Sequence, residues 1–115
     1  MAPRLSYAIK FVADMDKAVA FHRDTLGLAL KFQSPEWSEF VTGETTLALH
    51  AASRGNPAGS VELGFAVDDL KALYATRASN GLVFVEAPYE LHGTLLAKVR
   101  DSEGAAYSFS GPVQG

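Results

Sequence analysis

The side chains that could do chemistry in this sequence are few, and none of them is a cysteine. The absence of cysteine from the 115 residues excludes disulfides, thiolate metal sites and cysteine nucleophiles. The candidates for binding or catalysis are Tyr7, Trp37, His50, Glu62, His92 and Ser108. They are spread along most of the chain, so a shared site depends on the fold that gathers them.

Glu62 is the strongest candidate for a catalytic group. It begins a strand-like run, beside Gly64 and Ala66 on the same face. Partial burial there would make its carboxylate a proton acceptor or a hydrogen-bond anchor. The competing interpretation is an exposed carboxylate at a strand start. Ser108 is better explained as a small residue that makes room than as a nucleophile, because no base is placed to activate it.

The aromatic and histidine candidates each have a binding interpretation and a structural one. Trp37, the only tryptophan, could stack on a ligand or simply pack. Tyr7 could hydrogen-bond a ligand, although packing is favoured. His50 ends a strand beside a polar linker, and His92 precedes Gly93 in a loop. Each of the two histidines is therefore either a ligand contact or an ordinary exposed side chain.

The composition predicts one soluble domain and excludes two kinds of partner. The net charge is -3 and no run of lysine or arginine occurs, which argues against nucleic acid. No apolar run approaches membrane-spanning length, and the first residues lack the pattern of a signal peptide. We therefore expect a cytoplasmic protein with neither a nucleic-acid nor a membrane partner.

The elements that must position the candidate residues occur twice in the chain. A strand-like run at 7–12 is followed by Asp14, a plausible helix N-cap, and by a helical stretch that stops at Gly27. The same order of strand, acidic cap, helix and glycine returns from 62 to 82, which indicates an internal duplication. The identical residues at one fixed offset are Lys17 and Lys71, Ala18 and Ala72, Arg23 and Arg77, Gly27 and Gly81, and Leu28 and Leu82.

Three strand candidates follow each helix, divided by turn signals that include Pro88. They are residues 28–33, 37–42 and 45–50, and then 82–86, 94–100 and 105–110. The chain thus consists of two βαβββ modules, about 5–51 and about 61–111, joined by a polar linker at 52–60. A ferredoxin-like dimeric barrel has similar length, but it leaves the duplicated glycine-ended helices unexplained and expects fewer strands after each helix.

Strand alternation predicts where a ligand could bind. The large apolar residues of most strands would face the helices, and the opposite face is small and polar on three strands. On the first strand, however, Tyr7, Ile9 and Phe11 make one face bulky, and Trp37 and Glu39 should point the same way. Such a mixed lining is typical of small-molecule sites. A face that simply meets water remains the alternative.

The order and spacing of these motifs resemble the vicinal oxygen chelate superfamily of glyoxalases, bleomycin-resistance proteins and ring-cleaving (extradiol) dioxygenases. The resembling segments are VADMDKAVAF at 12–21, LGL at 26–28 and DSEG at 101–104. The resemblance covers roughly residues 5–111. It implies an α+β fold in which two tandem βαβββ modules form a curled, cup-shaped mixed sheet with the helices on its outer face. It also implies a homodimer whose cups lie between subunits.

The same resemblance implies a divalent metal held at the positions of Tyr7, Ala48, Glu62 and Ser108. Only Glu62 is a good ligand for such a cation. His50 could substitute for Ala48 by a register shift, which gives two weak candidates where a catalytic site needs about three. The two-histidine, one-carboxylate iron site of the dioxygenases is also missing. No cofactor is therefore expected, and nickel, zinc, manganese or iron is disfavoured.

Because most ligands of this metal site are missing, the chain resembles the antibiotic-binding branch of the superfamily. The expected function is to hold an organic ligand (a drug, a toxin or a metabolite) in a cup at a dimer interface. The expected contacts are Tyr7, Trp37, His50, Glu62, His92 and Ser108. One alternative is a metal-dependent lyase or epimerase of the glyoxalase type that uses Glu62 and His50. Another is a regulatory protein with a vestigial cup.

Overall fold

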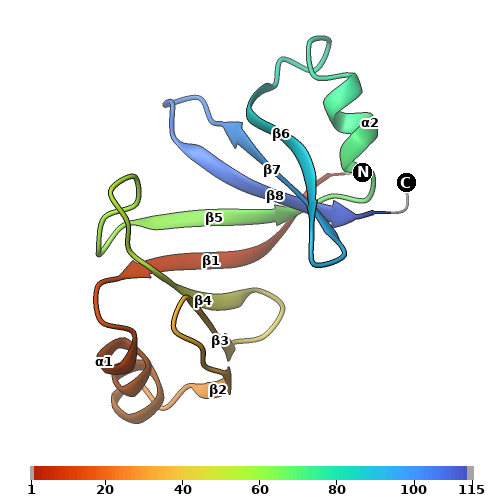
Figure 1. Ribbon diagram of the computed structural model, residues 1–115. Helices are drawn as coiled ribbons and strands as arrows, with labels where there is room; N and C mark the ends of the chain where they lie inside the picture. The colour runs from red at the N-terminus through yellow and green to blue at the C-terminus, as the bar shows by residue number, and fades with distance from the viewer. Residues whose placement is uncertain (1, 114–115) are drawn as a thin grey trace. The chain divides into compact units, whose positions relative to one another are not determined.

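The computed structural model describes residues 2–113, and its elements repeat one motif (Figure 1). The first set is β1 (Arg4–Val12), α1 (Met15–Ala20), the π-helical turn η1 (Phe21–Thr25), β2 (Ala29–Phe32), β3 (Trp37–Val41) and β4 (Thr46–Ala51). The second set is β5 (Val61–Ala66), α2 (Leu70–Ala75), β6 (Val83–Leu91), β7 (Thr94–Arg100) and β8 (Ala106–Pro112). The predicted α+β class with two βαβββ modules is confirmed.

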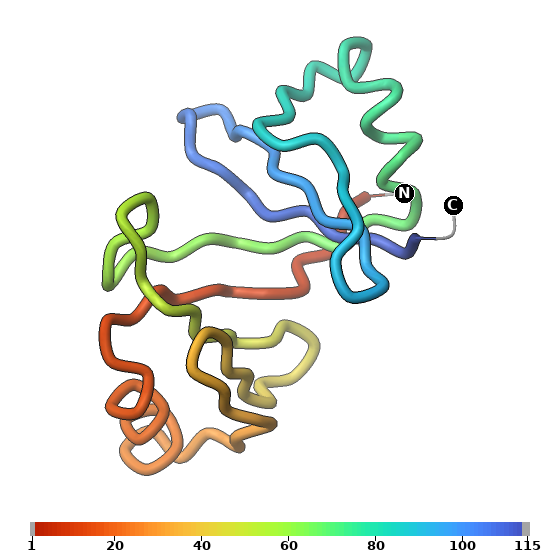
Figure 2. The backbone as a smooth tube through the Cα atoms, viewed as in Figure 1, coloured from red at the N-terminus to blue at the C-terminus, as the bar shows by residue number. Residues whose placement is uncertain are grey.

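The chain folds into two compact units. The first unit is Ser6–Glu62, and the second contains the chain from Leu63 onward together with the residues up to Leu5. The strands of the first unit lie in the order β2-β3-β4-β1, and those of the second in the order β6-β7-β8-β5. In each unit the first and last strands are parallel and the other pairs antiparallel. Figure 2 traces the β6–β7 hairpin of the second unit. The two units thus repeat both the order of their elements and the topology of their strands.

Both helices begin as the sequence predicts, but they end earlier: α1 ends at Ala20 and is followed by η1 up to Thr25, and α2 ends at Ala75, well before Gly81. The Asp14 carboxylate accepts from the backbone N–H of Lys17 at 3.1 Å, and Asp69 caps α2 in the same way. Gly27 and Gly81 have φ of 77° and 70°, the left-handed conformation in which glycine ends a helix without strain. Each α-helix is six residues long, and no helix within residues 2–113 is long and apolar enough to cross a membrane.

Each helix covers one face of the sheet in its own unit. In the first unit the buried side chains of Val19, Phe40 and Leu49 form the core between α1 and the sheet. In the second unit α2 contributes the buried Leu70 to a core that includes Val67 and Phe109. These are the large apolar strand faces that alternation assigns to the helices.

The prediction of a turn at Pro88 is wrong, because β6 continues through it to Leu91. Proline has no N–H to give to a neighbouring strand, so it is tolerated at bulges and on outer strands. Both conditions hold here. β6 is the outermost strand in its unit's sheet, and its register against β7 shifts between Glu86 and Tyr89.

Candidate functional site

The sheet of the first unit carries a cluster of aromatic and polar side chains on the face opposite α1. Alternation along β3 creates it: Ser38 and Phe40 pack toward the helix, so Trp37 and Glu39 project the other way. The first strand adds its own bulky residues to the same face, as the sequence predicts. We call this surface the Glu39 face and define it by Tyr7, Phe11, Trp37, Glu39 and His50.

Strand register decides which of these side chains meet. Trp37 lies opposite His50 across the antiparallel β3–β4 pair, and Glu39 lies opposite Ala48. The parallel β1–β4 pair then sets Phe11 beside His50. Ala48 is fully buried, and its small side chain leaves the space above it to the larger neighbours.

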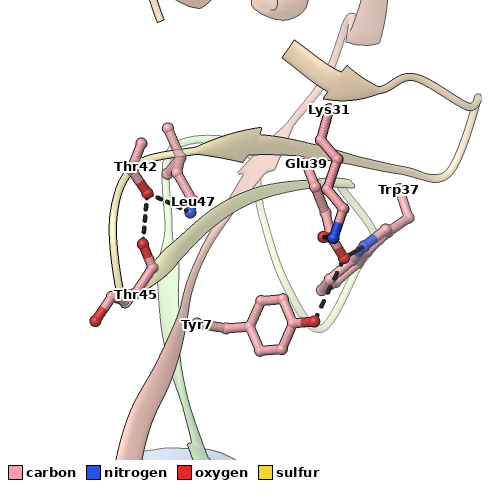
Figure 3. Close-up of polar contacts among 7 residues, drawn as sticks. All are labelled: Tyr7, Lys31, Trp37, Glu39, Thr42, Thr45 and Leu47. Atoms are coloured by element: carbon pink, nitrogen blue, oxygen red, sulfur yellow. Dashed lines mark hydrogen bonds and ion pairs between the residues drawn. The ribbon is translucent and has the colours of Figure 1, made fainter. Parts of the chain in front are cut away.

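The carboxylate of Glu39 is the polar centre of this face (Figure 3). The indole Nε1–H of Trp37 donates to its Oε2 at 2.8 Å, and the Tyr7 hydroxyl donates to the same oxygen at 3.5 Å. Lys31 Nζ lies 3.8 Å from the other oxygen, Oε1. Glu39 is only 7% exposed, and burying a carboxylate is costly unless donors replace its lost water. The two donors on Oε2 meet that requirement in part.

The two rings that hold this carboxylate belong to a cluster of four, whose neighbours contact one another edge to face or tilted. The Tyr7 and Trp37 centroids are 5.8 Å apart, those of Trp37 and His50 are 5.7 Å apart, and those of Phe11 and His50 are 5.3 Å apart. His50 Nδ1 lies 2.8 Å from the carbonyl oxygen of Ala51. Because a carbonyl only accepts, Nδ1 carries the hydrogen in this contact, and Nε2 is the nitrogen left to meet a ligand.

Tyr7 has an altered acidity because of this environment. Burial of the phenol, then the nearby Glu39 charge and its hydrogen bond, raise the pKa of Tyr7 above its ordinary value of 10.0. The neutral phenol is therefore the form that donates to Glu39, and it persists at physiological pH.

We expect the ultraviolet titration of Tyr7→Phe to lack one phenol ionisation that lies above ~10 in the wild type. The stabilisation from the raised pKa is present below ~10 and is lost as the pH rises through the folded-state pKa. Urea unfolding at several alkaline pH values, with Tyr7→Phe as reference, measures that loss. If the ionisation that Tyr7→Phe removes has a pKa at or below the ordinary value for tyrosine, the result would contradict the observed burial and hydrogen bond of Tyr7.

The structure brings three of the six predicted site residues together, namely Tyr7, Trp37 and His50. Glu62, on β5, is 7% exposed, so its interpretation as an exposed carboxylate is wrong. Ser108 is half-buried on β8. His92 is exposed in the β6–β7 turn, with φ of 52°. A shared site that includes these last three residues stays a prediction.

Glu39 is the central residue of this face, and it was missing from the predicted set of site residues. Alternation from Trp37 places it on the ligand face, but a glutamate on a strand is more often a solvated group. The indication in the sequence was its spacing, two residues from the only tryptophan and on the same strand face. Trp37 and Tyr7 both donate to one oxygen of Glu39, and this convergence makes Glu39 a candidate site residue. Only the three-dimensional register of the strands shows it.

A family model described as the Glyoxalase/Bleomycin resistance protein/Dioxygenase superfamily matches residues 4–109. The chain therefore belongs to this superfamily. No curated protein matches the sequence.

Solved structures share the fold at low sequence identity. A hypothetical protein from Bacillus halodurans superposes with a TM-score of 0.81 at 15% identity, covering 100% of this chain and 98% of its own. A superfamily member from Vibrio splendidus gives 0.69 at 16% identity, over 96% and 99% of the two chains. Methylmalonyl-CoA epimerase from Mycobacterium tuberculosis gives 0.76 at 18% identity, over 96% and 88%. At these identities the likeness is one of fold.

The residues do not fit the divalent metal site that the superfamily implies. The side chain of Ala48 has no atom that could ligate a metal, and the Tyr7 hydroxyl already donates a hydrogen bond to Glu39. His50 could offer only Nε2, since Nδ1 is bonded to the chain. Within the described part of the chain, no three His, Asp or Glu side chains gather into a possible metal site. No chemical step is therefore derived through a metal.

Proposed function

We propose that this protein binds a small organic molecule on the Glu39 face, without metal chemistry. The observation that carries the proposal is a buried carboxylate held by an indole and a phenol that belong to a cluster of four rings. Small-molecule sites combine such apolar and aromatic linings with a few fixed polar groups that orient the ligand. The resemblance to the antibiotic-binding branch adds a homodimer to this proposal, and light scattering would measure its mass.

Two features of the face support binding over a purely structural role. A core that served packing alone would gain little from a buried carboxylate, because apolar side chains of similar volume fill such space at no desolvation cost. His50 also keeps Nε2 as a polar group that a ligand could contact, since Nδ1 is bonded to the Ala51 carbonyl. Trp37 and Tyr7 are each partly exposed, so their rings remain accessible to a ligand.

The alternative is a metal-dependent lyase or epimerase of the glyoxalase type that uses His50 and Glu62. The fold likeness to methylmalonyl-CoA epimerase is the reason to consider this class of enzyme, although at 18% identity it indicates nothing about substrate. It requires donors that Ala48 and the occupied groups of Tyr7 and His50 do not supply. We therefore place it second.

A thermal-shift screen of aromatic drugs and metabolites tests the proposed function. We expect ligands that raise the melting temperature, with no dependence on added nickel, zinc or manganese, because binding to the native state alone stabilises it. The shift should disappear in His50→Ala and persist in His92→Ala, which serves as the matched surface histidine. If instead the protein binds metal stoichiometrically, and no ligand raises the melting temperature without that metal, the result would support the lyase or epimerase.

A further inference from the structure

We propose that the ligand of the Glu39 face is an organic cation, an aromatic amine or amidine whose N–H group binds Oε1 of Glu39 in place of Lys31. This inference rests on the proposed function and specifies its ligand class. It is carried by the unequal surroundings of the two carboxylate oxygens.

Oε2 of Glu39 is occupied and Oε1 is not. Trp37 Nε1 at 2.8 Å and the Tyr7 hydroxyl at 3.5 Å both approach Oε2. Among the described residues, the polar group at Oε1 is Lys31 Nζ at 3.8 Å, which is longer than a hydrogen bond. Oε1 therefore keeps its acceptor capacity within a carboxylate that the fold has already oriented.

Lys31 is a loosely held cation. Its side chain is 61% exposed, whereas that of Glu39 is 10% exposed. An exposed lysine at this separation gains little from its partner, since water screens the attraction and the flexible chain loses entropy when it is held. A ligand cation that brings its own buried apolar surface would displace Lys31 at small cost.

The charge of the Glu39 carboxylate favours a positive ligand over a negative one in the same place. Tyr7 and Trp37 stand edge to face with centroids 5.8 Å apart, next to the carboxylate that they hold (Figure 3). A ligand cation at Oε1 would form a charge-assisted hydrogen bond, which is stronger than a neutral one. An anion would meet the Glu39 charge in a partly buried setting, where water screens the repulsion poorly.

A matched set of benzamidinium, benzamide and benzoate tests the inference, because the three probes share a ring and differ in charge. Trp37 is the only tryptophan, so its fluorescence reports binding at this face without a label. We expect benzamidinium to bind about tenfold more tightly than benzamide, and benzoate to bind weakest. Benzamide or benzoate binding as tightly as benzamidinium would overturn the cation preference while leaving ligand binding intact.

Two variants separate the cation preference from general binding. Glu39→Gln keeps an acceptor for Trp37 and Tyr7 but removes the charge, so benzamidinium should lose about tenfold in affinity and benzamide should not change. Lys31→Met should strengthen benzamidinium binding, because a competing and repelling cation is removed. Lys17 lies on α1, and Lys17→Met is the control. It should change the affinity for neither benzamidinium nor benzamide.

The sign of the Lys31→Met effect is decisive. If that variant weakens benzamidinium binding, Lys31 recruits the ligand rather than yielding to it, and the inference is wrong. If none of the three probes perturbs Trp37 in the wild type, the inference is wrong, and the thermal-shift screen decides the proposed binding function separately. Circular dichroism of each variant establishes that the fold is kept.

Discussion

Replacing Phe40 with alanine should lower the free energy of unfolding by about 3–5 kcal/mol. Phe40 is fully buried and belongs with Val19 and Leu49 to the core between α1 and the sheet. Removing the ring forfeits its transfer from water and leaves a cavity that a sheet on one side and a helix on the other can close only partly. Urea unfolding followed by circular dichroism measures the change.

The neighbour Val41 supplies the matched control. It lies on the same strand and is 59% exposed, so Val41→Ala should change stability by less than about 0.5 kcal/mol. The comparison also tests the orientation of β3, because a strand that buries Phe40 against α1 must present Glu39 on the other face. Equal losses for the two variants would mean that β3 is turned differently and that the Glu39 face is misassigned.

Gly111→Ala should cost the second unit about 1–3 kcal/mol, as overpacking in a tight core does. A Cβ at Gly111 would lie 2.7 Å from the carbonyl oxygen of Val67 and 3.4 Å from the Cβ of Leu70. The closest of these is a backbone atom. Relief therefore requires a shift of the β5–α2 connection, where Val67 N–H donates to Ser110 O at 2.8 Å.

Gly55→Ala is the control for this effect. It also has an ordinary φ, and a Cβ there meets nothing within 4 Å. Restricting the unfolded chain should make this variant neutral or slightly more stable. Thermal unfolding of both variants beside the wild type gives the comparison. A Gly111→Ala melting temperature as high as that of Gly55→Ala would show that β8 and the β5–α2 connection lie farther apart than observed.

The fold could be predicted from the sequence because its signals are local and repeated. Asp14 and Asp69 each precede a helix and cap its N-terminus, and cap chemistry needs only neighbouring residues. The exception is Pro88, where a turn signal was outweighed by tertiary context. An outer strand with a bulge accommodates proline, and position within a sheet cannot be read from a dipeptide.

The candidate site was predictable only in part. Period-two alternation places Tyr7 and Trp37 on one face, and that prediction is confirmed. The importance of Glu39 could not be predicted, because it depends on which residues lie side by side across strands. The register that pairs Glu39 with Ala48 is a long-range property of the sheet.

The indole N–H resonance of Trp37 gives the most direct test of ligand binding at the Glu39 face. The protein has one tryptophan, so its nitrogen–proton correlation spectrum contains a single indole signal, and that proton is the one donated to Glu39 at 2.8 Å. Titration with benzamidinium should move this signal in a saturable way, and Glu39→Gln should need about tenfold more benzamidinium for the same movement. An indole signal that stays in place while signals of the second unit move would contradict the account.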